Sequence, residues 1–170
     1  MIIKDNQAIL IPVDFSKYSY IAVKQSYNLA KYTKSKLVLL HVSAKSDNDH
    51  QAELDQLAQS TRDESSLEVV TKIVKGELLE TVNKIAGELD CSLIIMALDE
   101  NAKFKNSLFG GGMTVPKFLV AAPCPVITLR STDMNQGCKN IVMPFVFLPE
   151  SREKVSYAVQ LARLYKADIR

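Results

Sequence analysis

The chain has 170 residues, of which 47% are hydrophobic, so we expect a globular protein of one or two domains. Its net charge is only +2 and basic residues are scattered among acidic ones without forming a basic stripe, which argues against a nucleic-acid partner. No apolar run is long enough to span a bilayer, and the early charges of Lys4 and Asp5 argue against a signal peptide, so we expect no membrane association.

The first predicted element is a buried strand at residues 9–13, an apolar run without polar interruption. Asp14 follows it, and Ser16 suits the N-cap of a helix that we expect from residue 16 to about 35. Such a unit opens a doubly wound fold, which binds ligands beyond the carboxyl ends of its strands. Asp14 is therefore a candidate ligand contact, although aspartate also caps the backbone of its own turn.

Strands and helices alternate along the next hundred residues. Further strands are predicted at 37–42, 67–74, 93–96 and 126–129, and helices at 51–61, 77–89 and 113–121. Partial polar alternation places the strand at 67–74 near an edge. The pattern predicts an α/β, doubly wound sheet of five parallel strands in a three-layer α/β/α fold.

Part of the first unit occurs again near the end of the chain. Ile-Val-Met-Pro-Phe at 141–145 resembles Ile-Leu-Ile-Pro-Val at 9–13, and position 141 lies 132 residues after position 9. Residues 161–169 match residues 29–37 at the same offset of 132. A constant offset over two separated blocks indicates an internal repeat. In the second copy, Val146 replaces Asp14.

The repeat suggests a division of the chain into domains. We expect a first domain at 1–132, a linker at 133–138, and the first βα unit of a truncated second domain at 139–170. The alternative is a single domain with a C-terminal helical extension.

Four motifs in this order resemble the universal stress protein family, whose fold is Rossmann-like and similar to that of adenine nucleotide alpha hydrolases. They are Ile-Pro-Val-Asp-Phe-Ser at 11–16, Leu-Leu-His-Val at 39–42, Leu-Ile-Ile-Met at 93–96 and Pro-Cys-Pro-Val at 123–126. The resemblance covers residues 8–130, and 139–170 look like the start of a second such domain, as in a tandem member.

The resemblance implies a site for an adenine nucleotide. In members that bind ATP, the acid after the first strand meets the ribose or adenine, and a valine of the second strand lines the adenine slot. A loop with Gly-x-x-Gly, nine residues, then Gly and Ser or Thr wraps the phosphates. Carried over to this chain, the candidate cofactor-binding residues are Pro12, Val13, Asp14, Val42, Met96, Ala97, Gly110, Gly111, Gly112 and Met113.

The loop after Met96 departs from that pattern. Its glycine positions fall either on Ala97, Glu100, Gly110 and Gly111, or on Asp99, Ala102, Gly112 and Met113. In both registers Gly-x-x-Gly is lost, which hinders close approach of phosphate to the backbone and adds repulsive carboxylates. Three consecutive glycines still form an anion nest in principle. Lys103 and Lys105 either supply positive charge to a phosphate or simply belong to a solvated loop. Two alternatives therefore stay open: the protein binds no cofactor, or it binds ATP or AMP.

Other reactive side chains favour structural roles. His41 lies inside a strand pattern, and Cys124 lies between two prolines, where a packed thiol is expected. The three cysteines lack metal-site spacing and indicate reduced thiols in a cytoplasmic protein. We found no catalytic motif, so we expect no enzyme.

These observations lead to two functional hypotheses. The first is a non-enzymatic cytoplasmic stress-response protein that acts through dimerisation or protein contacts. The resemblance implies pairing through the last strand, Val126 to Leu129, in a homodimer or a pseudo-dimer with its own second domain, because an apolar edge strand requires a partner. The second is an ATP- or AMP-binding regulatory module that senses adenine nucleotides.

Overall fold

Twelve helices and strands make up the described part of the chain, residues 3–43, 50–97, 115–129, 137–144, 146 and 151–170 of the computed structural model. In chain order they are β1 (Ala8–Pro12), α1 (Lys17–Thr33), β2 (Lys36–Ser43), α2 (Gln51–Ser65), β3 (Val69–Lys75), α3 (Leu78–Glu88), β4 (Leu93–Ala97), α4 (Val115–Ala121), β5 (Val126–Leu129), β6 (Asn140–Ile141), α5 (Ser151–Tyr165) and β7 (Asp168–Ile169). The elements predicted up to residue 129 all occur, within a few residues of their expected bounds.

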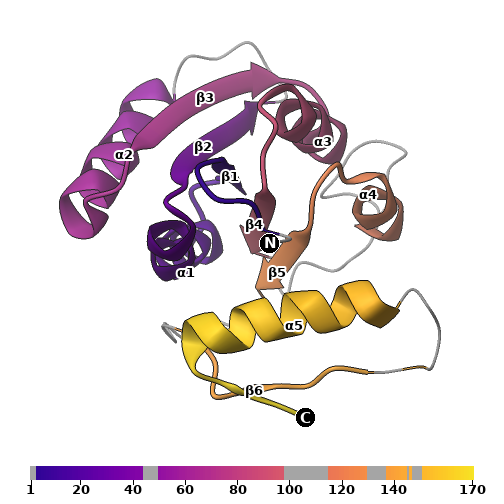
Figure 1. The fold of residues 1–170 in the computed structure, drawn as a ribbon. Helices are drawn as coiled ribbons and strands as arrows, with labels where there is room; N and C mark the ends of the chain where they lie inside the picture. The colour runs from indigo at the N-terminus through magenta and orange to yellow at the C-terminus, as the bar shows by residue number, and fades with distance from the viewer. Residues whose placement is uncertain (1–2, 44–49, 98–114, 130–136, 145, 147–150) are drawn as a thin grey trace.

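Five strands form the central sheet in the order β3-β2-β1-β4-β5, and every pair is parallel. Helices cover both faces, as Figure 1 shows, so the predicted doubly wound three-layer fold is confirmed. The edge position predicted for the third strand is also correct. β1 lies between β2 and β4, and all five of its residues are buried.

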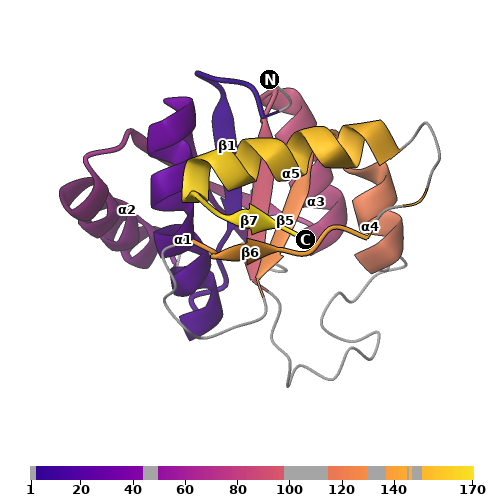
Figure 2. The same cartoon turned by 60° about the horizontal axis from the view of Figure 1, so that its bottom comes forward.

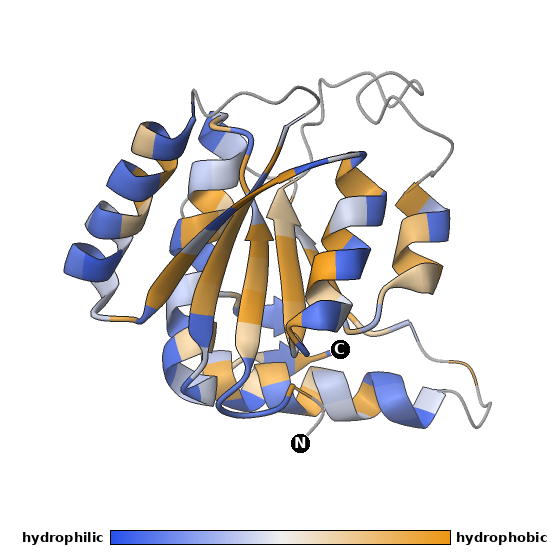
Figure 3. Ribbon diagram, turned by 90° about the horizontal axis from the view of Figure 1, so that it is seen from above, coloured by the Kyte–Doolittle hydropathy of each residue, from blue (hydrophilic) through white to orange (hydrophobic). Residues whose placement is uncertain are grey.

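Alternate residues of β1 enter two separate cores. Ile9 and Ile11 pack on the side of α1 and α2, whereas Ala8 and Leu10 pack on the side of α3 and α4. Figure 3 shows the resulting apolar strands between the helices, with hydrophilic residues over the outer side of α2. Burying a side chain of this size stabilises the fold by roughly 1.5–3 kcal/mol, so this unbroken apolar run anchors the sheet.

The beginning of α1 follows from its sequence. Ser16 is the N-cap, and the backbone N–H of Ser19 donates to its Oγ at 3.3 Å. The buried side of the helix carries small and branched side chains, among them Ala22, Ser26 and Ala30, and these let it approach the sheet closely. The predicted N-cap is therefore confirmed.

A second, smaller pair of strands lies outside the five-stranded sheet. β6 and β7 pair in parallel, with Asn140 opposite Asp168 and Ile141 opposite Ile169. In the first unit Ala8 lies opposite Lys36 and Ile9 opposite Leu37, so each pair recurs exactly one repeat length, 132 residues, later. The two units thus share a β-α-β register, although the domain division at 1–132 and 139–170 stays a prediction.

Helix α5 packs against the first unit. Tyr157, Leu161 and Leu164 contact the core on the side of α1, which also includes Ile127 and Leu129 of β5. Figures 1 and 2 show α5 alongside β5, with β6 and β7 on its far side. The Gln160 amide donates to the carbonyl of Ile3 and accepts from its N–H, both at 3.1 Å. The residues before β1 are therefore joined to α5.

Replacing Gln160 by alanine should lower the free energy of unfolding by about 2 kcal/mol, because the buried N–H and carbonyl of Ile3 lose their partner. Urea denaturation measures the difference. Gln56→Ala, on the exposed side of α2, is the matched control and should change stability by less than about 0.5 kcal/mol. Equal effects of the two substitutions would contradict a stabilising contact at Ile3.

Candidate functional site at the carboxyl edge of the sheet

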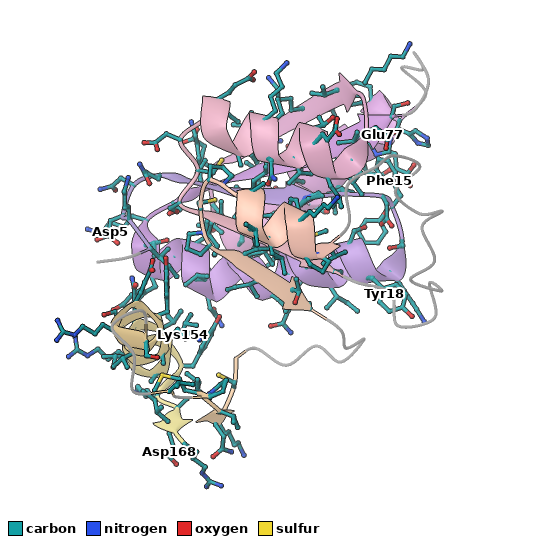
Figure 4. All side chains as sticks on the ribbon, turned by 90° about the vertical axis from the view of Figure 1, so that its right-hand side faces the viewer. Asp5, Phe15, Tyr18, Glu77, Lys154 and Asp168 are labelled. Atoms are coloured by element: carbon teal, nitrogen blue, oxygen red, sulfur yellow. The ribbon has the colours of Figure 1, made fainter. Side chains whose placement is uncertain are left out.

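The predicted site residues that the structure describes lie at one edge of the sheet, because parallel strands end on the same side. Asp14 directly follows β1, Val42 lies near the end of β2, and Ala97 ends β4. Asp14 is exposed, whereas Val42 and Ala97 are half-buried. These three residues define what we call the rim. In Figure 4, Phe15 and Glu77 mark this side of the molecule, opposite Asp5.

The remaining predicted residues divide into two groups. Pro12, Val13 and Met96 are buried beneath the rim, and the backbone of Val13 is already engaged: its N–H donates to Leu40 at 2.8 Å, and its carbonyl accepts from His41. These three residues shape the floor of the rim. The others, Gly110, Gly111, Gly112 and Met113, lie outside the described residues, as do Lys103 and Lys105.

Asp14 caps its own turn. Its Oδ1 accepts hydrogen bonds from the N–H of Ser16 at 3.0 Å and from the Ser16 hydroxyl at 2.6 Å. The two interpretations of Asp14, a cap of its own turn and a ligand contact, are therefore compatible. One carboxylate oxygen holds the turn, while Oδ2 takes no part in these bonds and lies on an exposed side chain.

The surroundings of Asp14 stabilise the negative charge of its carboxylate. Partial burial acts to raise the pKa of the carboxyl group, but the hydrogen bonds from the hydroxyl and N–H of Ser16, together with the nearby hydroxyl of Ser19, outweigh it. The net result is a pKa below the ordinary value of 3.8. Asp14 is consequently an anion at neutral pH, suited to accept hydrogen bonds from the hydroxyls of a ligand.

Three rings lie just behind Asp14, on the α2 side of the sheet. The ring centroid of Phe15 is 4.8 Å from that of His41 and 4.9 Å from that of His50, and the two imidazoles are 4.8 Å apart. His41 also bonds through Nδ1 to the carbonyl of Val13 at 2.8 Å, which agrees with its predicted structural role. Sequence reasoning missed Phe15 and His50, since no spacing rule connects them.

Two of the three thiols, those of Cys91 and Cys124, pack in the core. Burial raises the pKa of Cys91 to about 11 and that of Cys124 to about 12, and both pack in the core beside α3 and α4. Cys124 thus agrees with the predicted packed thiol. Within the ranges that the structure describes, no group of three or more His, Cys, Asp or Glu side chains could hold a metal ion.

None of the described helices combines the length and the apolar character that crossing a bilayer demands.

The sequence profile of the universal stress protein family matches residues 6–130. The chain belongs to the universal stress protein family. The match includes β1 to β5 and with them the whole rim, so the resemblance noted from four short motifs is confirmed at the level of the family. No curated protein sequence matches the chain significantly.

Solved structures of universal stress proteins share the fold. One in complex with cAMP is 15% identical, with a TM-score of 0.60, over 75% of this chain and 98% of that one. The universal stress protein from Archaeoglobus fulgidus in complex with dAMP is 16% identical, with a TM-score of 0.56, over 72% of this chain and 96% of that one. At these identities the likeness shows the fold alone.

A longer neighbour matches almost the entire chain. A functionally unknown protein from Pseudomonas aeruginosa PAO1 is 26% identical, with a TM-score of 0.74. The match covers 99% of this chain, and this chain spans 60% of the Pseudomonas protein. The arrangement of β6, α5 and β7 against the first unit is therefore included in the likeness.

Replacing Ser16 by alanine should raise the pKa of Asp14 and lower the free energy of unfolding by about 1 kcal/mol, since the turn and the N-cap both lose a hydroxyl. A carbon-13 NMR titration of the Asp14 carboxyl measures the first effect. Because the pKa of folded Asp14 is depressed, its stabilisation is present above the ordinary value of 3.8 and disappears as pH falls through the folded value. The difference in free energy of unfolding between Ser16→Ala and wild type should therefore narrow in acid. The control Ser60→Ala should leave the pKa of Asp14 unchanged.

Proposed function

We propose that this universal stress protein is a non-enzymatic stress-response protein whose rim binds an adenine mononucleotide as a regulatory ligand. The observation that carries the proposal is Asp14, an ionised and exposed carboxylate with Oδ2 outside the turn, at the edge where such folds bind ligands. Proteins of this family are generally not enzymes, and two neighbours of the same fold are complexes with cAMP and dAMP.

The chemistry of the rim favours the nucleoside end of the ligand. A carboxylate accepts hydrogen bonds from ribose hydroxyls but repels phosphate, so the sugar is the part that belongs beside Asp14. Val42 offers a half-buried apolar surface to the base. Ala97 stands where close approach of a polyphosphate to the backbone would need glycine, which supports a mononucleotide such as AMP over ATP.

Isothermal titration calorimetry tests the ligand with AMP, cAMP, dAMP and ATP. We expect binding of a mononucleotide, weakened roughly tenfold in Asp14→Asn because a charge-assisted hydrogen bond is lost. Asp5→Asn, on the opposite side of the molecule in Figure 4, is the matched control and should bind like wild type. Absence of heat with all four nucleotides, together with no adenine nucleotide in mass spectra of the freshly purified protein, would refute the site.

The outer edge of β5 supports a second part of the proposal, pairing with a protein partner. No described strand lies beyond β5 in the five-stranded sheet. The N–H of Ile94 donates to the carbonyl of Pro125 at 3.0 Å, so the backbone groups of Pro125 and Ile127 face β4. Those of Val126 and Thr128 then face outward, because backbone groups alternate along a strand. An edge of this kind accepts another strand.

Light scattering tests this pairing with a substitution at the edge. The chain should form dimers at high micromolar concentration, and Thr128→Pro should be monomeric because it removes one outward N–H without disturbing the bonds to β4. Thr128→Ala keeps the N–H and is the control, which should dimerise normally. A stable wild-type monomer would exclude a homodimer through β5.

Residues 139–170 are, in this proposal, the first βα unit of a second domain of the same fold. Their support is the shared strand register at an offset of 132 and the match over 99% of the chain to the longer Pseudomonas protein. Val142 is 79% exposed, while Leu10, its counterpart in the first unit, is fully buried.

A further inference from the structure

The backbone at Phe15 has a conformation that side chains rarely adopt. Its φ is +60°, in the left-handed region that favours glycine. Lys34 and Ser66 also have positive φ, but both are helix C-caps, where this conformation is common. Phe15 instead lies between a strand and the N-cap of a helix, so something other than capping holds it there.

The unusual conformation serves the turn that presents Asp14. Phe15 lies between the two partners of these hydrogen bonds, the N–H and hydroxyl of Ser16 and Oδ1 of Asp14, so its φ sets how they meet. Those two hydrogen bonds orient the carboxylate and stabilise its charge. A residue that sets φ at position 15 therefore also sets the orientation of the carboxylate.

Ring contacts with two imidazoles, one stacked and one tilted, offset the cost of this conformation. The Phe15 and His50 rings lie at 24° to each other and the Phe15 and His41 rings at 44°. Each imidazole is anchored in turn: His41 to the carbonyl of Val13 at 2.8 Å, and His50 to Oε2 of Glu53 at 3.4 Å. The hydroxyl of Tyr20 donates to the other oxygen of Glu53, also at 3.4 Å.

The geometry points to Phe15 as a positioning residue: stacked on His50 and in tilted contact with His41, it holds the turn in the left-handed conformation that orients Asp14 toward its ligand. The start of α2, where His50 lies, thereby supports the rim from behind. The inference concerns the regulation and geometry of the same site, and its ligand-binding part rests on the proposed function.

The decisive comparison is between Phe15→Ala and Phe15→Gly. Both remove the ring, but glycine adopts a φ of +60° without strain, whereas alanine does not. The Tm of Phe15→Gly should therefore be about 2–4 °C higher than that of Phe15→Ala, the reverse of the usual order for glycine and alanine. Tyr18→Ala and Tyr18→Gly, one turn later inside α1, form the matched control pair and should keep the usual order, with alanine higher.

Two spectroscopic signals report on the positioning role itself. In Phe15→Ala, the Ser16 amide should exchange faster with solvent and the pKa of Asp14 should rise, because the hydrogen bonds to Oδ1 weaken. His50→Ala, which leaves position 15 unchanged, should show the same two changes to a smaller degree. Phe15→Leu fills space without stacking and should resemble Phe15→Ala.

Nucleotide affinity supplies the third measurement. Phe15→Ala should bind AMP roughly fivefold more weakly than wild type, and Phe15→Gly should recover part of the loss. If wild type binds no nucleotide, the proposed ligand fails while the unfolding and amide measurements still decide the role of Phe15. A Phe15→Gly protein less stable than Phe15→Ala, or a Phe15→Ala protein with unchanged Ser16 exchange and Asp14 titration, would overturn the positioning role.

Discussion

Burial of β1 on both faces and along both edges is the constraint on which the rest of the structure depends. A strand enclosed in this way tolerates no unpartnered polar group, so all its side chains are apolar. The first polar side chain, Asp14, appears where the strand leaves the core. The same constraint that stabilises the sheet therefore delivers a carboxylate to the edge at which folds of this kind bind ligands.

The turn after β1 shows how one residue serves structure and recognition together. A carboxylate has two oxygens, and Asp14 commits Oδ1 to Ser16 without consuming Oδ2. The strained backbone at Phe15 makes this division feasible, and the rings of His41 and His50 stabilise it from the α2 side. Strain of this kind is stored where surrounding contacts overdetermine the conformation, and such places are often functional.

The second unit shows that similar sequences experience different environments. β6 and β7 repeat the register of β1 and β2, yet Val142 is exposed where Leu10 is buried. α5 meets the β5 side of the first unit through Leu161 and through the bonds between Gln160 and Ile3. The repeat thus contacts the first unit through α5, and the domain boundary near residue 132 stays a prediction from the sequence.

Local sequence patterns determined the order of strands and helices, the parallel sheet, the edge position of β3 and the N-cap at Ser16, because periodicity and capping report on burial and chain direction at each point. Tertiary structure alone decided which distant residues meet. Phe15, His41 and His50 come from three segments, and Gln160 reaches Ile3 across 157 positions. Side chains that satisfy one another across such distances leave no periodic signal, because their pairing depends on how whole elements pack rather than on spacing along the chain.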